Sequence, residues 1–399
     1  MSDDLGLFTD EPTDVRRRRS DPEAFRRRKR RRWVTALAAV FVVVLVGGGV
    51  LYGASQIVQL GAYEDFSGEG TGQVVIRVES GETVSAIGST LADQGVVAST
   101  KAFIEAAEGN RRINGIQPGF YLMRKEMSGE SAVEHIMSPD AKVGRVEVRG
   151  GMRLEDQLAP DGGTTPGVLT RLAEATCVGR AECITSEEMH EVAATADLRS
   201  LGVPEWAVGP ASEAEPRRRL EGLILPAVYD VKPGASAEDV LRDVVTRSAT
   251  MLQAAGLPQA AEGTGHTPYE LLTIASIVQS EGIGKDFGKI ARVIENRLAP
   301  PAMKLGMDST INYPLDKPAL LTKPEDRGRP GPYNTYLNYG LPPTPISAPG
   351  QDAIIAAEKP TEGSWKFFVK CYPDGTSCFA DTYEQHQTYI EEARARGAF

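Results

Sequence analysis

The sequence predicts an α+β protein with a single membrane-spanning helix near its N-terminal end. Three observations support this class: residues 33–53 carry no charge, Val74, Ile76 and Val78 alternate as in a strand, and residues 267–282 carry helix start and stop signals. The chain has 399 residues, of which 41% are hydrophobic and 25% charged. This composition is close to the globular average, so we expect two or three folded domains beyond the apolar segment.

Charge is divided unevenly along the chain. Residues 1–32 hold eleven Lys or Arg and seven Asp or Glu, so this tail carries +4 and the remainder carries −14. An acidic body lacks the basic face that neutralises phosphates, which excludes nucleic acid as the main partner.

Residues 33–53 are long enough to cross a bilayer, because 21 helical residues extend ~31 Å. The basic run RRRKRRR at 26–32 precedes the segment, and residues 54–62 contain no Lys or Arg. The positive-inside rule therefore predicts a cytoplasmic basic tail over 1–32, a transmembrane helix over 33–53, and export of everything that follows. The alternative is a cleaved signal peptide, but the basic leader is long and no A-x-A site follows the segment.

The exported part is expected to begin with a linker over residues 54–71, which are polar and rich in glycine. A small α+β module follows at 72–142. Its strand is succeeded by a turn and by two short helices, the second capped by Ser99. Residues 143–399 form the larger domain, in which clusters of Gly, Pro, Ala and charge predict an irregular insertion at about 160–220.

All four cysteines lie in the exported part. Cys177 and Cys183 bracket five residues, and Cys371 and Cys378 flank a Pro-Asp-Gly turn that would bring them face to face in a hairpin. Two local disulfides are therefore expected in an oxidising compartment, with buried free thiols as the alternative. A zinc site is not expected, since no histidine is near either pair.

A well-delimited helix is expected over residues 267–282. Thr267 is an N-cap, Pro268 fits the first helical position, and Glu270 completes a capping box. Gly282 marks the end of the helix.

Glu281 is the candidate for acid–base chemistry in this helix. It falls on the apolar face, because Ile274, Ile277 and Val278 precede it by seven, four and three residues. The carboxyl group also faces the negative end of the helix dipole, and both effects should raise its pKa toward the range of a general acid. The alternative is a structural glutamate that points into water or pairs with Arg292 or Lys285.

The loops after this helix are rich in tyrosine. Flat aromatic faces beside hydrogen-bonding groups suit sugar rings, although such loops also serve packing. The residues concerned are Tyr313, Tyr333, Asn334, Thr335, Tyr336 and Tyr339.

From about Gln73 to His386 the chain resembles the YceG-like family of endolytic murein transglycosylases. The resemblance rests on ASIVQSE at 275–281, NRL at 296–298, Asp308-Ser309-Thr310, YNTY at 333–336, GLPPTPISAPG at 340–350 and the terminal TYEQH. It implies a membrane anchor, a LysM-like module at 72–142 and a mixed α+β catalytic domain. The chain departs from the family pattern where Gln279 replaces a common Glu, Ser309 a Pro and Ser377 a His.

The resemblance makes Glu281 the catalytic residue and implies binding of peptidoglycan glycan strands. The residues expected to contact substrate are Asn296, Arg297, Asp308, Thr310, Tyr333, Asn334, Thr335 and Tyr336.

A lytic transglycosylase needs only one carboxyl group, because the sugar's own 6-hydroxyl is the nucleophile. The resemblance therefore implies cleavage between N-acetylmuramic acid (MurNAc) and N-acetylglucosamine (GlcNAc) with a 1,6-anhydro product, and no metal or cofactor. It also implies a single-pass protein of the bacterial cell membrane that works near cell wall synthesis proteins.

Other enzyme classes lack their motifs, since G-x-S-x-G, H-E-x-x-H and P-loop patterns do not occur. The alternative to a transglycosylase is a non-catalytic, membrane-tethered protein that binds glycan or scaffolds a division complex.

Overall fold

A computed structural model describes residues 33, 37, 40–50, 63–159, 162–177, 183–319 and 322–399. Residues 40–50 are helical, whereas the basic tail and the linker up to residue 62 lie outside the described residues. Among the described residues, no helix combines the length and the apolar character that crossing a membrane requires. Part of the expected anchor at 33–53 also lies outside them.

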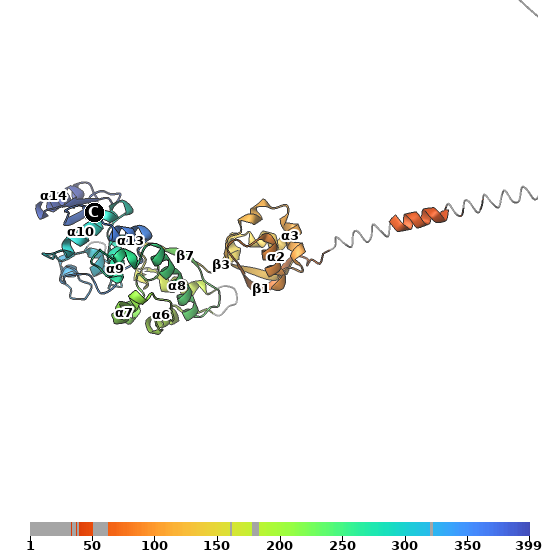
Figure 1. Ribbon diagram of the computed structural model, residues 1–399, viewed down its shortest axis with the longest axis horizontal. Coiled ribbons are helices and arrows are strands. Elements are labelled where there is room, and N and C mark those ends of the chain that lie inside the picture. The colour runs from red at the N-terminus through yellow and green to blue at the C-terminus, as the bar shows by residue number, and fades with distance from the viewer. Residues whose placement is uncertain are drawn as a thin grey trace, which may run out of the picture. The chain divides into compact units, whose positions relative to one another are not determined.

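The first folded module is built on a three-stranded antiparallel sheet (Figure 1). Its strands lie in the order β1 (Glu69–Val78), β2 (Gly119–Met127) and β3 (Lys142–Val143). The helices are α2 (Val84–Asp93), α3 (Thr100–Ala107) and α4 (Gly129–Ile136). Ser99 caps α3 as expected, and its hydroxyl accepts a hydrogen bond from the Ala102 N–H at 3.2 Å. The module has its own apolar core, in which Leu91, Phe103 and Met123 are completely buried.

The remainder of the chain is mostly helical, with three two-stranded antiparallel sheets. The pairs are β4 (Arg145–Val148) with β7 (Ala227–Asp230), β5 (Gln157–Leu158) with β6 (Thr164–Thr165), and β8 (Phe367–Lys370) with β9 (Ser377–Ala380). The helices are α5 (Val168–Ala175), α6 (Ser186–Thr195), α7 (Glu205–Glu213), α8 (Ala237–Ala254), α9 (Pro268–Glu281), α10 (Phe287–Leu298), α11 (Asp308–Asn312), α12 (Pro324–Arg327), α13 (Gln351–Glu358) and α14 (Tyr383–Ala395).

Helix α9 lies at the centre of this second core. It contacts α7, α10, α11 and α13, and its residues from Leu271 to Val278 are all buried. The expected capping box is present, because Thr267 and Glu270 exchange hydrogen bonds between side chain and backbone. Gly282 ends the helix in an extended conformation, and a Cβ there would require the end of the Ile290 side chain to move.

The region 160–220 corrects our expectation of irregular chain. It contains α5, α6 and α7, whose buried side chains belong to the same core as α9. Leu169, Leu172, Met189, Ala207 and Ala211 are almost completely inaccessible to solvent. The sequence here is rich in alanine and in charged residues, so it gave no clear signal for three short helices. Helices of this length become stable only by packing on larger neighbours.

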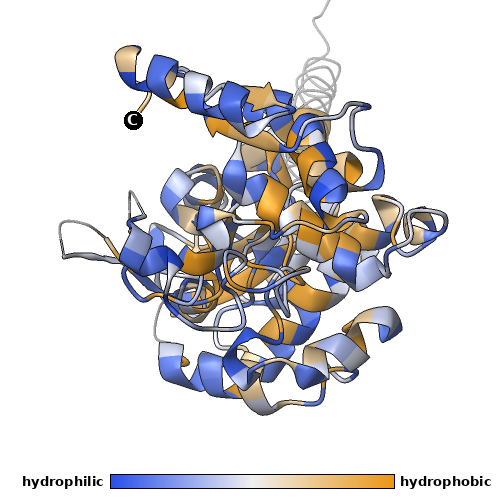
Figure 2. Cartoon of the chain, turned by 90° about the vertical axis from the view of Figure 1, so that its left-hand side faces the viewer, coloured by the Kyte–Doolittle hydropathy of each residue, from blue (hydrophilic) through white to orange (hydrophobic). Residues whose placement is uncertain are grey.

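Helix α14 covers the C-terminal hairpin and keeps a solvated outer face. Figure 2 shows the helix that ends at the C-terminus as largely hydrophilic, and Ala393 is its fully buried residue. The helix packs against both β8 and β9.

Both predicted cysteine pairs form disulfides in the structure. Cys177 bonds to Cys183, and Cys371 bonds to Cys378 across the Pro-Asp-Gly turn. The strand register sets Cys378 opposite Val369 rather than opposite Cys371, so the second bridge crosses the hairpin diagonally.

Candidate active site

Glu281 is the last residue of α9 and is half-buried. Its Oε1 accepts a hydrogen bond from the backbone N–H of Ser309, the second residue of α11, at 3.0 Å. The site is therefore formed where the C-terminal end of one helix meets the beginning of another.

Burial raises the pKa of Glu281 above its ordinary value, and the nearby charge of Asp308 raises it further. Hydrogen bonds from Ser309 and the charge of Lys370 oppose this shift without reversing it. A carboxyl group in this environment tends to hold a proton at a pH where an exposed glutamate has lost it, as a general acid must.

The two cations nearest to Glu281 in the sequence, Lys285 and Arg292, have other partners. Arg292 donates to the carbonyl oxygens of Thr361 at 2.8 Å and Pro360 at 3.2 Å. Lys285 forms an ion pair with Asp374 at 3.2 Å. The alternative in which Arg292 or Lys285 pairs with Glu281 therefore does not match the structure.

Asp308 is held as a fixed charge beside Glu281. Its Oδ1 accepts a hydrogen bond from the Tyr336 hydroxyl at 2.6 Å, and its Oδ2 accepts one from Thr322 at 2.7 Å. Arg327 lies 3.6 Å from Oδ2 and stacks over the Tyr336 ring. Asp308 and Tyr336, both half-buried, thus flank the candidate acid on one side.

Four residues expected to contact substrate lie beneath the surface. Thr310 and Thr335 bond to each other at 2.8 Å, and Tyr333 bonds to Thr344 at 2.8 Å. Asn334 donates to the carbonyl oxygens of Arg327 and Arg329. Because all four are buried and partnered within the protein, the structure supports a positioning role for them, and Tyr339 is the exposed tyrosine of these loops.

Asn296 and Arg297 fasten α10 to neighbouring loops. Asn296 donates to the carbonyl oxygens of Gly363 and Trp365. Arg297 donates to those of Leu305 and Lys366 and lies over the Phe367 ring. These bonds join α10 to Leu305 and to the segment 363–366.

A polar stripe on α9 receives the proline-rich loop, a role that the sequence analysis missed. Ser276 accepts a hydrogen bond from the Ile346 N–H at 3.0 Å, and Gln279 accepts one from the Gly350 N–H at 2.9 Å. Ser280 and Ser347 bond through their hydroxyls at 3.0 Å. The signal was available, since three polar residues at helical spacing interrupt an apolar helix.

A second buried carboxyl group, Glu221, was also missed. It is only 2% exposed and accepts hydrogen bonds from the Tyr313 hydroxyl at 3.0 Å and the Leu154 N–H at 3.3 Å. Burial raises its pKa to about 7. Glu221 and Tyr313 belong to the wall of a cavity of about 440 Å³ that Arg153 and Arg218 also line, and Glu281 is not among its lining residues.

Groups of His, Cys, Asp or Glu that could hold a metal ion do not occur within the described ranges of the chain.

The fold and the Glu281 site can now be compared with known proteins. A family model described as the YceG-like family matches residues 76–392, so the chain belongs to the YceG-like family. This confirms the resemblance that the motifs indicated.

Two relatives carry the name endolytic murein transglycosylase. The Bacillus subtilis protein is 26% identical over 348 residues, which cover 86% of this chain and 90% of that protein. The Streptococcus pneumoniae protein is 26% identical over 334 residues, which cover 80% of this chain and 58% of that protein. A crystal structure of a yceG-like protein from Listeria monocytogenes is 22% identical, with a TM-score of 0.48, covering 79% of this chain and 98% of that chain.

Proposed function

We propose that this protein is a lytic transglycosylase that cuts the glycan strands of peptidoglycan internally, with Glu281 as its catalytic residue. The environment of Glu281 carries the proposal: a half-buried carboxyl group with a raised pKa, free of the cations nearby in sequence, with fixed groups around it. The family and the names of the two relatives support the same activity.

In the proposed reaction, protonated Glu281 gives its proton to the glycosidic oxygen while the bond from that oxygen to the anomeric carbon of MurNAc breaks. The resulting carboxylate then accepts the proton of that sugar's 6-hydroxyl as its oxygen bonds to the anomeric carbon. A 1,6-anhydro ring closes, Glu281 regains its proton, and no water is consumed.

The surrounding residues match these two tasks. The negative charge of Asp308 favours the protonated state that the first step needs, and it also favours the positive charge that develops on the sugar ring. The Ser309 N–H stabilises the carboxylate that exists between the steps. One carboxyl group can therefore serve as acid and then as base.

Digestion of purified peptidoglycan by the full-length protein tests the proposal, with the products identified by mass spectrometry. We expect internal fragments with 1,6-anhydro ends, each lighter by one water than a hydrolysed product. Reducing ends instead would show hydrolysis and contradict the transglycosylase mechanism. Tight binding of glycan without cleavage would favour the scaffold alternative.

We also propose that residues 33–53 anchor the protein in the cell membrane, with the basic tail in the cytoplasm and Glu281 outside. The uncharged segment and the arginines before it support this placement. A reporter that works only outside the cytoplasm should be active when fused after Phe399 and inactive when fused before Arg16. The opposite pattern would overturn the orientation.

The module from β1 to β3 is proposed to be LysM-like and to bind glycan. Its separate apolar core, formed by the three-stranded sheet and the helices packed on it, supports an independent binding unit. Deleting residues 72–142 should weaken retention on insoluble peptidoglycan in a pull-down assay, and unchanged retention would contradict the assignment.

A further inference from the structure

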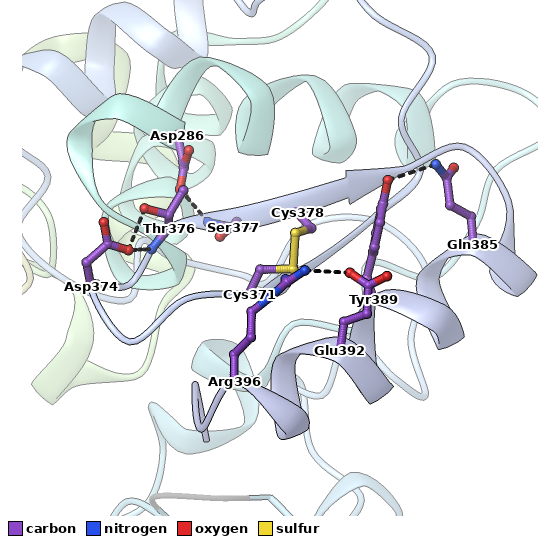
Figure 3. Close-up of a disulfide and its surroundings, with 10 residues drawn as sticks. All are labelled: Asp286, Cys371, Asp374, Thr376, Ser377, Cys378, Gln385, Tyr389, Glu392 and Arg396. Atoms are coloured by element: carbon purple, nitrogen blue, oxygen red, sulfur yellow. Dashed lines mark hydrogen bonds and ion pairs between the residues drawn. A yellow bond between two sulfur atoms is a disulfide. The ribbon is translucent and has the colours of Figure 1, made fainter.

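The hairpin of β8 and β9 is closed by the Cys371–Cys378 disulfide and docks beside the end of α9. Cys371 is fully buried, and Figure 3 shows its bond to Cys378. Helix α14 packs against both strands of the hairpin, and Arg396, which follows this helix, stacks over Tyr372. At the tip, Asp374 accepts hydrogen bonds from the Thr376 N–H at 2.9 Å and the Thr376 hydroxyl at 2.6 Å. These bonds and the disulfide together fix the shape of the turn.

The hairpin contacts the residues that immediately follow Glu281. Lys285 forms an ion pair with Asp374, and a Cβ on Gly375 would lie 3.3 Å from Ile283. Asp286 is only 5% exposed, and its Oδ2 accepts a hydrogen bond from the Ser377 N–H at 2.8 Å. The turn at 282–286 is thus held by a segment about 90 residues later in the chain.

Asp286 departs from the usual behaviour of its position. It is the N-cap residue of α10, where an aspartate normally accepts a hydrogen bond from its own helix, yet its side chain makes no capping bond. Its carboxyl group instead bonds the Ser377 N–H of the hairpin. A local preference given up for a distant contact often marks a functional constraint.

Glu281 needs such support because it is the final residue of a helix. The last carbonyl groups of a helix lack partners within the helix, so the final turn depends on outside contacts for its position. The hairpin also carries Lys370, next to Cys371. The positive charge of Lys370 lowers the pKa of Glu281.

We propose that Asp286 is a positioning residue and that, with the disulfide-closed hairpin, it holds the turn 282–286 so that Glu281 stays against Ser309. The proposal rests on the proposed function of Glu281. It adds a structural requirement: the hairpin must be closed for the acid to be aligned.

Three variants of the full-length protein test this requirement. Asp286→Ala and the double variant Cys371→Ser/Cys378→Ser should each lower kcat by about tenfold to a hundredfold, since small misplacements of a reacting group have effects of this size. KM should change little, because neither variant removes a residue that is expected to contact the glycan. The matched control Cys177→Ser/Cys183→Ser removes the other disulfide and should keep the wild-type kcat.

Reduction gives a test that does not depend on the folding of a variant. In the Cys177→Ser/Cys183→Ser background the hairpin bridge is the remaining disulfide, because the chain has four cysteines. At a temperature below the melting temperature, a reductant should lower kcat, and reoxidation should restore it. Wild-type kcat in the reduced protein and in Asp286→Ala would overturn the proposal.

Hydrogen exchange separates failure of this inference from failure of the proposed function, because it measures position without catalysis. The amides of residues 282–286 and of Ser309 should exchange faster in Asp286→Ala than in the wild type, whereas the control Asp239→Ala on α8 should not change them. Wild-type protection in Asp286→Ala overturns the positioning role. A wild-type protein that fails to cut glycan, with faster exchange in the variant, overturns only the proposed function.

Discussion

Two glutamates, Glu221 and Glu281, both have a raised pKa, but their surroundings differ. Glu221 lies in the wall of the cavity with almost no exposed surface, and the Tyr313 hydroxyl and the Leu154 N–H both donate to one of its oxygens. Glu281 stands at the end of a helix, half-buried, with Ser309 as its hydrogen-bond donor. Burial raises the pKa of both carboxyl groups.

The two carboxyl groups differ in exposure, and a raised pKa does not by itself make a catalytic acid. A general acid must also reach the oxygen that it protonates. Glu221 is 2% exposed and one of its oxygens already accepts two hydrogen bonds, so little of its carboxyl group is available to a sugar. Glu281 combines a raised pKa with partial exposure, so the comparison favours Glu281 as the catalyst and Glu221 as a structural group.

The largest expected effect is on catalysis by Glu281→Gln. The amide keeps the shape of the side chain and cannot transfer the proton. The rate of peptidoglycan cleavage should therefore fall by roughly 10²–10⁴-fold or more, with the fold intact. Glu221→Gln should retain most of the activity. Comparison of digestion rates would reverse the assignment if Glu221→Gln were inactive and Glu281→Gln active.

The second largest expected effect is the contribution of Glu221 to the pH dependence of the free energy of unfolding. Because its pKa is raised to about 7 from an ordinary value of 4.5, the folded state binds this proton more tightly than the unfolded state. Its contribution to the free energy of unfolding is present below pH 4.5 and lost as the pH rises to about 7, on the order of 3 kcal/mol in total.

Denaturant titrations across this pH range, for wild type and Glu221→Gln, would measure that contribution. The variant should become more stable relative to wild type as the pH rises. A constant difference between the two proteins would mean that Glu221 is not protonated in the folded state.

A smaller effect is expected from Asp308→Asn, which sharpens the description of Glu281. The variant keeps an acceptor for Tyr336 and removes the charge that raises the pKa of Glu281. Glu281 should then lose its proton at a lower pH, so the basic limb of the pH–rate profile should move to lower pH. Lys370 and Arg297, the nearby cations, are unchanged in this variant. If the basic limb did not move, the charge of Asp308 would have no effect on the pKa of Glu281.

The smallest effect is expected at the opposite end of the same helix. Glu270 is exposed and closes the capping box with Thr267. Glu270→Gln should cost at most about 1 kcal/mol in the free energy of unfolding, with wild-type cleavage. Thermal unfolding and digestion assays would check both parts, and a large loss of activity would mean that α9 acts through more than its final residue.

Local sequence chemistry predicted the elements whose signals lie within one turn of the chain. The limits of α9 follow from Thr267, Glu270 and Gly282. The disulfides follow from short spacing and a turn between the cysteines. The short helices α5, α6 and α7 were not predicted, because their stability comes from burial against the rest of the core.

The position of the acid follows from local sequence, because the end of a capped, largely apolar helix places Glu281 at a boundary between core and solvent. The polar residues around it follow from contacts between segments that are separate in the sequence. Thr310, Thr335, Tyr333 and Asn334 are buried, and their side chains bond to partners within the same group of loops. Asp286 accepts a hydrogen bond from a hairpin about 90 residues away. Such a partner cannot be inferred from residue spacing, because a buried polar group is stable only where the folded chain supplies a hydrogen-bond partner for it.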